Sequence, residues 1–167
     1  SADAYLAQGM IGDVTVERKW FQNFSAGPHV LMKYESIDPK GKHGLLTHDV
    51  QGQVGGTAVR LGTVMTYDRR DAIYWARRET FLHMKNSYYR NAFGSDFDFE
   101  CYFLEARQFI PMFSAGALGI SALLNLKSGD IPFRELATAD GDYNLRGIVR
   151  GKYRDRDILV LNFCAGA

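Results

Sequence analysis

Apolar and polar residues alternate along most of this chain, in segments separated by turn residues. The clearest alternation lies at residues 117–127. One face of that segment carries Leu118, Ile120, Ala122, Leu124 and Leu126, and the other carries Gly119, Ser121, Asn125 and Lys127. Leu123 is the one apolar residue on the polar face. A period of two residues predicts a β-strand with one apolar and one polar face.

The same alternation predicts further strands along the chain. They are expected at residues 13–21, 29–36, 59–68, 81–89, 96–110 and 157–165. Residues 1–11 show no clear pattern, and turns are expected at residues 23–28, 91–95 and 111–116. The apolar phase changes near residues 102–104, which predicts a β-bulge there. The whole chain, residues 1–167, is therefore predicted to be a single all-β domain with about seven strands.

The lengths of the strands and of their connections favour a membrane setting. Strands of about nine to fifteen residues are long for a soluble sheet and can cross a bilayer at a tilt. Short turns alternate with long polar connections at residues 38–56 and 128–156, and Tyr and Trp residues lie near strand ends. These features predict an antiparallel transmembrane β-barrel with outward leucines and a polar lumen. In a soluble barrel the leucines would point inward instead.

Composition adds few constraints. The formal net charge is +1, which gives no argument for a nucleic-acid partner. Aromatic residues make up 13% of the chain, and 17 glycines stand against 4 prolines, as is typical of an all-β chain with tight turns. The two cysteines match no metal-site spacing. No apolar run is long enough for a transmembrane helix, and residues 1–10 do not resemble a signal peptide.

No pattern of catalytic residues stands out. The four histidines have no metal-ligand spacing, and neither a nucleophile elbow nor a phosphate-binding loop is present. Asp96, Asp98 and Glu100 alternate and could bind a cation. We favour a different interpretation, in which these carboxylates and Arg107 are polar residues facing a lumen. We therefore expect no enzyme activity, no metal and no cofactor.

Residues 144–157 form a basic, glycine-rich stretch that leads into the last predicted strand. Two Arg-Gly pairs, Arg146-Gly147 and Arg150-Gly151, lie four residues apart. Glycine permits sharp turns, and the arginine fork pairs well with carboxylates even when partly buried. Such a loop could fold back and dock against the protein. A basic hairpin solvated at the surface is an equally open alternative.

Three stretches within residues 62–163 stand out as motifs. They are Thr-Tyr-Asp-Arg-Arg-Asp at 66–71, Gly-Ser-Asp-Phe-Asp-Phe at 94–99 with Glu-Ala-Arg-Gln-Phe-Ile-Pro at 105–111, and Gly-Asp-Ile-Pro-Phe-Arg-Glu-Leu at 129–136 with Leu-Arg-Gly at 145–147 and Arg-Asp-Arg-Asp at 154–157. In these motifs and their order, residues 62–163 resemble the BamA-like superfamily of bacterial surface-antigen barrels.

The resemblance implies a specific loop and a larger barrel. Residues 128–156 would be the family's conserved loop that folds back inside the barrel. Arg146 and Gly147 would lie at its tip, followed by Arg150, Arg154 and Asp155. The family barrel has sixteen strands, and those that follow this loop are missing here. We therefore expect a segment of a barrel, a piece that closes with other chains, or a shortened relative.

The resemblance also implies a function: insertion, assembly or translocation of proteins at the bacterial outer membrane, without covalent catalysis. The expected partners are the lipid bilayer, other subunits of an outer-membrane complex, and unfolded or secreted proteins; nucleic acid is not expected. Two alternatives stay open. One is a soluble or periplasmic β-barrel that binds a small apolar ligand, and the other is a membrane-anchoring barrel for a partner protein.

Overall fold

The structure is a computed structural model, and it describes residues 5–39, 52, 54–70, 79–112, 116–138 and 154–166. Within this part of the chain, eight strands form one antiparallel sheet in the order β1-β3-β4-β5-β6-β7-β10, with β2 also paired to β3. The strands are β1 (Tyr5–Thr15), β2 (Arg18–Phe21), β3 (Phe24–Pro39), β4 (Gly55–Arg70), β5 (Glu79–Tyr89), β6 (Phe99–Met112), β7 (Gly116–Gly129) and β10 (Ile158–Gly166).

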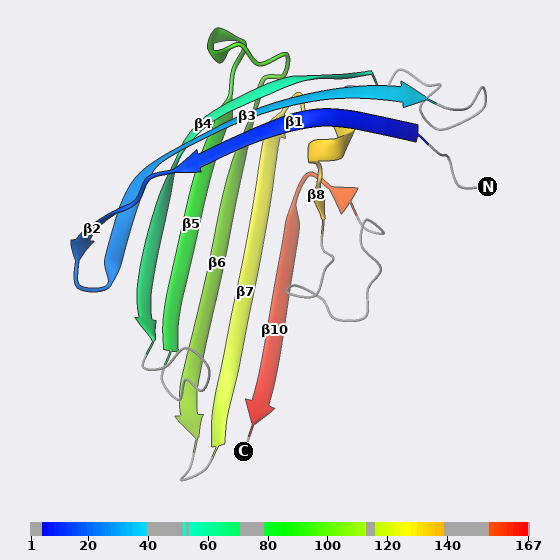
Figure 1. The fold of residues 1–167 in the computed structure, drawn as a ribbon. Coiled ribbons are helices and arrows are strands. Elements are labelled where there is room, and N and C mark those ends of the chain that lie inside the picture. Colours follow the sequence, from blue (N-terminus) through cyan, green and yellow to red (C-terminus); the bar gives the residue numbers. More distant parts are fainter. Residues whose placement is uncertain are drawn as a thin grey trace.

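Small elements complete the fold. A second sheet pairs β8 (Ala137–Thr138) with β9 (Arg154–Asp155), and the 3-10 helices are η2 (Asn91–Phe93) and η3 (Phe133–Glu135). Figure 1 shows the large sheet curving like part of a cylinder wall, with β8 on its concave side. In the described residues β1 and β10 are the two edges of this sheet, which does not close on itself.

The two faces of the curved sheet differ in polarity. Residues that point to the concave side include Lys33, Arg60, His83, Lys85, Glu105, Arg107, Ser121, Asn125 and Lys127. Residues on the convex side include Val30, Met32, Leu61, Met65, Leu82, Met84, Leu104, Leu118, Ile120, Leu124, Leu126, Leu159 and Leu161. The predicted split of residues 117–127 into an apolar and a polar face is therefore confirmed.

The all-β prediction is confirmed, but the N-terminal region differs from expectation. Residues 5–11, in which no pattern was found, belong to β1. The alternation was not recognisable there because Gly9 and Gly12 interrupt it. The strand predicted at residues 13–21 is two strands, with a break at residues 16–17. The turn predicted at residues 23–28 is wrong, since β3 already begins at Phe24.

Gly27 explains why a turn-like sequence lies inside a strand. The chain between β1 and β2 passes close to it, and the Val16 amide donates a hydrogen bond to the Pro28 carbonyl oxygen at 3.1 Å. A Cβ atom at Gly27 would lie 1.8 Å from the carbonyl oxygen of Val16. Glycine is therefore needed here for close packing of two main chains, not for a turn.

The β-bulge predicted near residues 102–104 is also wrong. β6 pairs with β5 and with β7 in an unbroken register. Phe99, Phe103, Glu105 and Arg107 consequently share the concave face. The change in apolar phase arises because this face is apolar at one end of β6, where Ile131 covers Phe99, and charged toward the other end. Its polarity changes along the strand while the backbone geometry stays regular.

We predict that Gly27→Ala destabilises the sheet by about 1–3 kcal/mol, because the added methyl group must displace main-chain atoms of Val16. Gly12→Ala is the matched control, since its Cβ would meet nothing within 4 Å, and it should change stability by less than about 0.5 kcal/mol. Urea unfolding in detergent micelles measures both. Equal stability of the two variants would contradict the close approach at Gly27.

Candidate functional site

The chain leaves β7 and folds back onto the concave face of the sheet. We call residues 129–138, which include η3 and β8, the returning segment. It begins at Gly129, whose φ is +106°, and a Cβ there would lie 2.6 Å from the Asp98 carbonyl oxygen. The Asp130 amide donates to that same oxygen at 2.9 Å. A glycine turn thus redirects the chain from the end of β7 toward β3 and β4.

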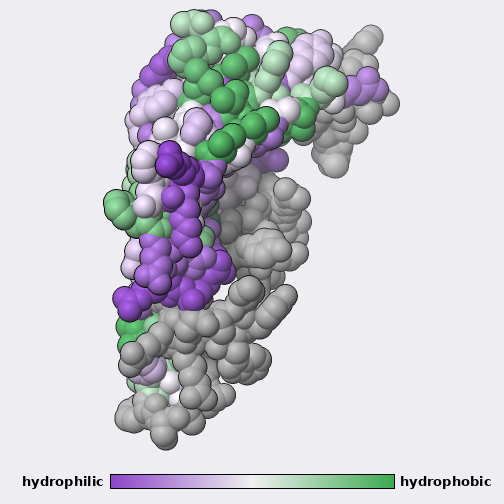
Figure 2. Space-filling view, turned by 60° about the vertical axis from the view of Figure 1, so that its left-hand side comes forward, coloured by the Kyte–Doolittle hydropathy of each residue, from purple (hydrophilic) through white to green (hydrophobic). Residues whose placement is uncertain are grey.

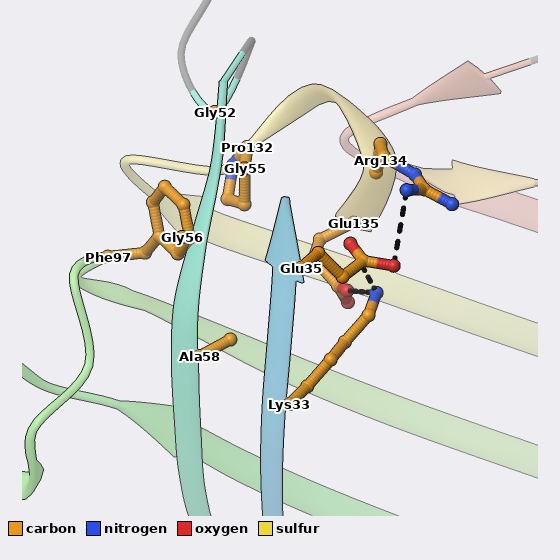
Figure 3. A pocket seen from close by; sticks show the side chains of 10 residues that line it. All are labelled: Lys33, Glu35, Gly52, Gly55, Gly56, Ala58, Phe97, Pro132, Arg134 and Glu135. Carbon is orange, nitrogen blue, oxygen red and sulfur yellow. Dashed lines mark hydrogen bonds and ion pairs between the residues drawn. The ribbon is translucent and has the colours of Figure 1, made fainter. Parts of the chain in front are cut away.

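Charged side chains bind the returning segment to β3. The Lys33 ammonium lies 2.7 Å from Glu135 Oε1 and 3.2 Å from Glu35 Oε2, and Arg134 Nη1 lies 3.2 Å from Glu35 Oε1 (Figure 3). About a fifth to a quarter of each of these side chains is exposed. Their pairing is therefore less screened than that of surface ion pairs.

A second contact holds the returning segment from a strand further along the same concave face. Lys127 on β7 donates a hydrogen bond to the main-chain oxygen of Glu135. Strands β4, β5 and β6 lie between β3 and β7 in the sheet. Glu135 therefore connects two strands that do not touch each other, and the segment spans the hollow of the sheet.

Apolar packing complements these polar contacts. Ile131 is buried against Ala58, Tyr89 and Phe99, and the Tyr89 and Phe99 rings stack with centroids 3.9 Å apart. Phe97 and Leu136 pack around this cluster. Further along, Ala137 is buried with Ile158 and Val160 of β10. The returning segment is thus fixed by a small apolar core as well as by charges.

A small pocket lies between the returning segment and the ends of β3 and β4. Its lining residues are Lys33, Glu35, Gly52, Gly55, Gly56, Ala58, Phe97, Pro132, Arg134 and Glu135 (Figure 3). Gly52 and Gly56 have positive φ, and a Cβ at Gly52 would lie 2.7 Å from Pro132 Cβ. Its charged groups pair with one another, so the arrangement is suited to holding the segment in place.

Further polar side chains on the concave wall also pair with one another. His29 is fully buried, with Nε2 2.7 Å from Asp13 Oδ1 and 3.0 Å from Arg60 Nη2. Nearer the other end of the sheet, the Arg107 guanidinium lies 4.5 Å from the centroid of the Phe81 ring and pairs with Glu105 at 3.1 Å. No group of three or more His, Cys, Asp or Glu side chains in the described ranges could hold a metal ion.

The predicted loop residues divide into two groups. Arg146, Gly147 and Arg150 lie outside the residues that the structure describes, so their docking against the wall stays a prediction. Arg154 and Asp155 form β9, where they pair with Thr138 and Ala137 of the returning segment and are exposed to solvent. The residues just before and just after 139–153, which the structure does not describe, therefore pair with each other on the concave side of the sheet.

The residues predicted to face a lumen are not together. Asp96 Oδ2 accepts a hydrogen bond from the Thr57 amide at 2.7 Å, and Asp98 pairs with Arg90 at 2.7 Å. Glu100 lies on the convex side, so grouping it on one face with Arg107 was wrong: the two are an odd number of residues apart in an unbroken strand.

Arg90 joins these carboxylates at the end of the sheet. It pairs with Glu100 as well as Asp98, and Glu100 also accepts a hydrogen bond from the Tyr102 hydroxyl at 2.8 Å. The hydrogen bond to Glu100 raises the pKa of Arg90. Asp98 and Glu100 are thus partners of a surface arginine.

The main residues of the site, Lys33, Glu35, Arg134 and Glu135, were missed by sequence reasoning. Alternation did place Lys33 and Glu35 together on the polar face of their strand. However, Glu135 lies 102 residues from Lys33 in the chain. No local pattern indicates a pair at such a separation.

Comparison with known proteins does not assign this chain to a family. It matches no family model and no curated protein. Among the described residues, no helix has the length and apolar character needed to span a membrane. Any functional conclusion must therefore be drawn from the sheet and the returning segment themselves.

We predict a coupling free energy of about 1 kcal/mol between Lys33 and Glu135 in a double-mutant cycle of Lys33→Met and Glu135→Gln. Each single variant should also speed proteolysis within the returning segment, because one of its tethers is lost. Unfolding in detergent and timed proteolysis measure these effects. Asp130→Asn is the control, since this exposed side chain lies on the same segment without a described partner. Additive single-variant effects would contradict the tether.

Proposed function

We propose that this chain forms one side of a transmembrane β-barrel in a bacterial outer membrane. Its convex face would contact lipid, and its concave face would line a polar lumen that contains the returning segment. The observation that carries this proposal is the distribution of polarity across the curved sheet. It is the reverse of the distribution in a soluble barrel, where the inner face is apolar.

The exposed apolar side chains support a lipid-facing surface. Large apolar residues of the sheet that are exposed lie on its convex face, with Ile11 of edge strand β1 as the exception. Met32 is 58% exposed, Leu161 53% and Phe163 69%. Figure 2 shows apolar side chains gathered over the upper part of the visible surface. A soluble monomer rarely exposes so continuous an apolar surface.

Strand length supports the same proposal. β3 and β4 each have 16 residues, and β6 and β7 each have 14. Strands of soluble sheets are most often about 5–6 residues long, whereas about 9–11 tilted residues cross a bilayer. These strands could therefore span the apolar layer and extend beyond it.

Aromatic residues lie toward the ends of the convex face. Phe24 and Tyr67 face each other across β3 and β4 at the end of the sheet where residues 22–23 form the turn into β3, which we call the turn end. Toward the opposite end, Tyr88 and Tyr102 make an edge-to-face contact with centroids 6.2 Å apart. Two aromatic bands with aliphatic residues between them are typical of transmembrane barrels.

The open edges set a condition on this function. In lipid, the unpaired main-chain groups of β1 and β10 would carry a cost of several kcal/mol each. A working barrel therefore needs further strands to pair with these edges. We propose that they come from the remainder of a longer protein or from other chains.

The resemblance to BamA-like barrels suggests the biological role. We propose that the closed barrel takes part in the insertion, assembly or translocation of proteins at the outer membrane. Its partners would then be other subunits and unfolded or secreted proteins. The returning segment, bound to both β3 and β7, would restrict passage along the lumen until its tethers open.

We predict that the purified chain requires detergent or lipid to stay dispersed, and that it migrates as an assembly larger than its 18.8 kDa. The physical reason is the exposed apolar face together with two open edges. Intact-mass measurement and light scattering, with and without detergent, test this. A monodisperse 18.8 kDa monomer in plain buffer would contradict the membrane proposal and favour a soluble ligand-binding barrel.

A further inference from the structure

Aromatic and basic side chains gather at the turn end of the convex face. We call Arg18, Trp20, Phe21, Phe24, Tyr67 and Arg69 the interfacial belt. The register puts Arg18 opposite Ala26, and Phe21 opposite Phe24, which in turn is opposite Tyr67, all on the convex face. The register shifts between Lys19 and Phe21, and Trp20 lies in that shift, where its ring is covered by the Arg18 guanidinium. Arg69 follows Tyr67 by two residues on the same strand and so shares its face.

Trp20 and Phe21 are the exposed aromatic members of the belt, whereas Phe24 and Tyr67 are partly buried. Trp20 is 57% exposed and Phe21 73%. The indole N–H of Trp20 donates to the Ala26 carbonyl oxygen at 3.3 Å, and the Phe21 and Phe24 ring centroids are 6.2 Å apart. Figure 1 shows their strand, β2, at the margin of the sheet beside the start of β3. Large rings are thus held in fixed positions on an outward surface.

The two arginines of the belt have no carboxylate partner among the described residues. Arg18 lies over the Trp20 ring, with its guanidinium carbon 5.0 Å from the ring centroid. Other described arginines differ: Arg60, Arg70 and Arg90 each pair with a carboxylate. The donors of Arg18 and Arg69 are therefore available to an anion outside the protein.

We propose that the interfacial belt binds the phosphate groups of phospholipid headgroups. Tryptophan and other aromatic rings favour the boundary between headgroups and acyl chains, and arginine pairs with phosphate through its fork of N–H donors. Arg69 lies two residues beyond Tyr67 toward the end of the sheet, where it would meet headgroups directly. Arg18 lies level with Ala26 and Met65, and its long side chain could extend to the same boundary. This inference rests on the proposed function. It adds two expectations: the protein binds anionic lipid more strongly than neutral lipid, and the sheet lies at a fixed depth in the bilayer.

The depth of Trp20 tests the first half of the inference. The chain has two tryptophans, Trp20 and Trp75, so Trp75→Phe leaves a single reporter in the belt. Vesicles would carry brominated lipids labelled either just below the headgroup or near the end of the acyl chain. We expect the shallow label to quench Trp20 more strongly. Stronger quenching by the deep label, or none in vesicles that bind the protein, would overturn the proposal.

Lipid charge tests the second half. The double variant Arg18→Gln/Arg69→Gln is compared with Lys19→Gln, which removes a cation from the opposite face of the same strand. Binding is measured to phosphatidylcholine vesicles with and without phosphatidylglycerol, after circular dichroism has confirmed equal folding. We expect the affinity gained from phosphatidylglycerol to fall about tenfold in the double variant and to remain in Lys19→Gln.

The possible failures are distinguishable. If every protein binds both kinds of vesicle and the double variant keeps the full gain from phosphatidylglycerol, the belt proposal fails while the membrane function stands. An equal loss in Lys19→Gln would also overturn it, because the effect would then reflect net charge alone. If the unaltered chain binds neither kind of vesicle, both the belt and the proposed function are overturned.

Discussion

The antiparallel register of the long strands, which is unbroken from β3 to β10, is the constraint on which the other features depend. Because side chains alternate strictly, each strand sorts its residues onto two faces, and a slip of one residue would exchange them. From β3 to β10 the register puts most charged side chains on the concave side and a band of aliphatic side chains on the convex side, although aliphatic residues such as Leu31 and Leu123 also face the concave side. The returning segment can form its ion pair with Lys33 and its main-chain hydrogen bond with Lys127 because both lysines point to the concave side.

The concave and convex faces of the sheet differ in the contacts for which their side chains are suited. On the concave wall several charged side chains pair with one another, as in Lys33–Glu135 and Arg107–Glu105. The convex face is apolar in its middle and carries aromatic residues toward its ends. At the turn end it adds the interfacial belt, whose arginines lack described carboxylate partners. A sheet that binds its own chain on one side and a lipid surface on the other would account for both patterns.

Much of the fold could be predicted from sequence because its signal is local. Alternation alone located β4, β5, β6, β7, β10 and part of β3, and it placed Leu124 and Asn125 on opposite faces of β7. It failed where polarity changed for a non-local reason. The phase change in β6 reflects coverage of Phe99 by Ile131, which comes from another part of the chain, and the Ser-Ala-Gly-Pro stretch belongs to a strand because Gly27 packs against Val16.

The site was harder to predict than the fold. The loop predicted at residues 128–156 includes the returning segment at residues 129–138, but Arg146 and Gly147 at its predicted tip lie outside the described residues, so their role stays a prediction. The contacts that hold the returning segment come instead from Lys33 and Glu35, about a hundred residues earlier. A single sequence does not reveal such a long-range ion pair, because the pair produces no pattern among the residues next to either partner.

The environments of two neighbouring residues on β7 would show whether the convex face contacts lipid and the concave face contacts water. Nitroxide labels would be placed at Leu124→Cys or Asn125→Cys, with the native Cys101 and Cys164 replaced by serine, in vesicle-bound protein. If the convex face contacts lipid, the label at position 124 collides mainly with oxygen dissolved in lipid, and the label at position 125 collides mainly with a water-soluble nickel chelate. The reverse result, or equal access of the chelate to both positions, would contradict a lipid-facing convex surface.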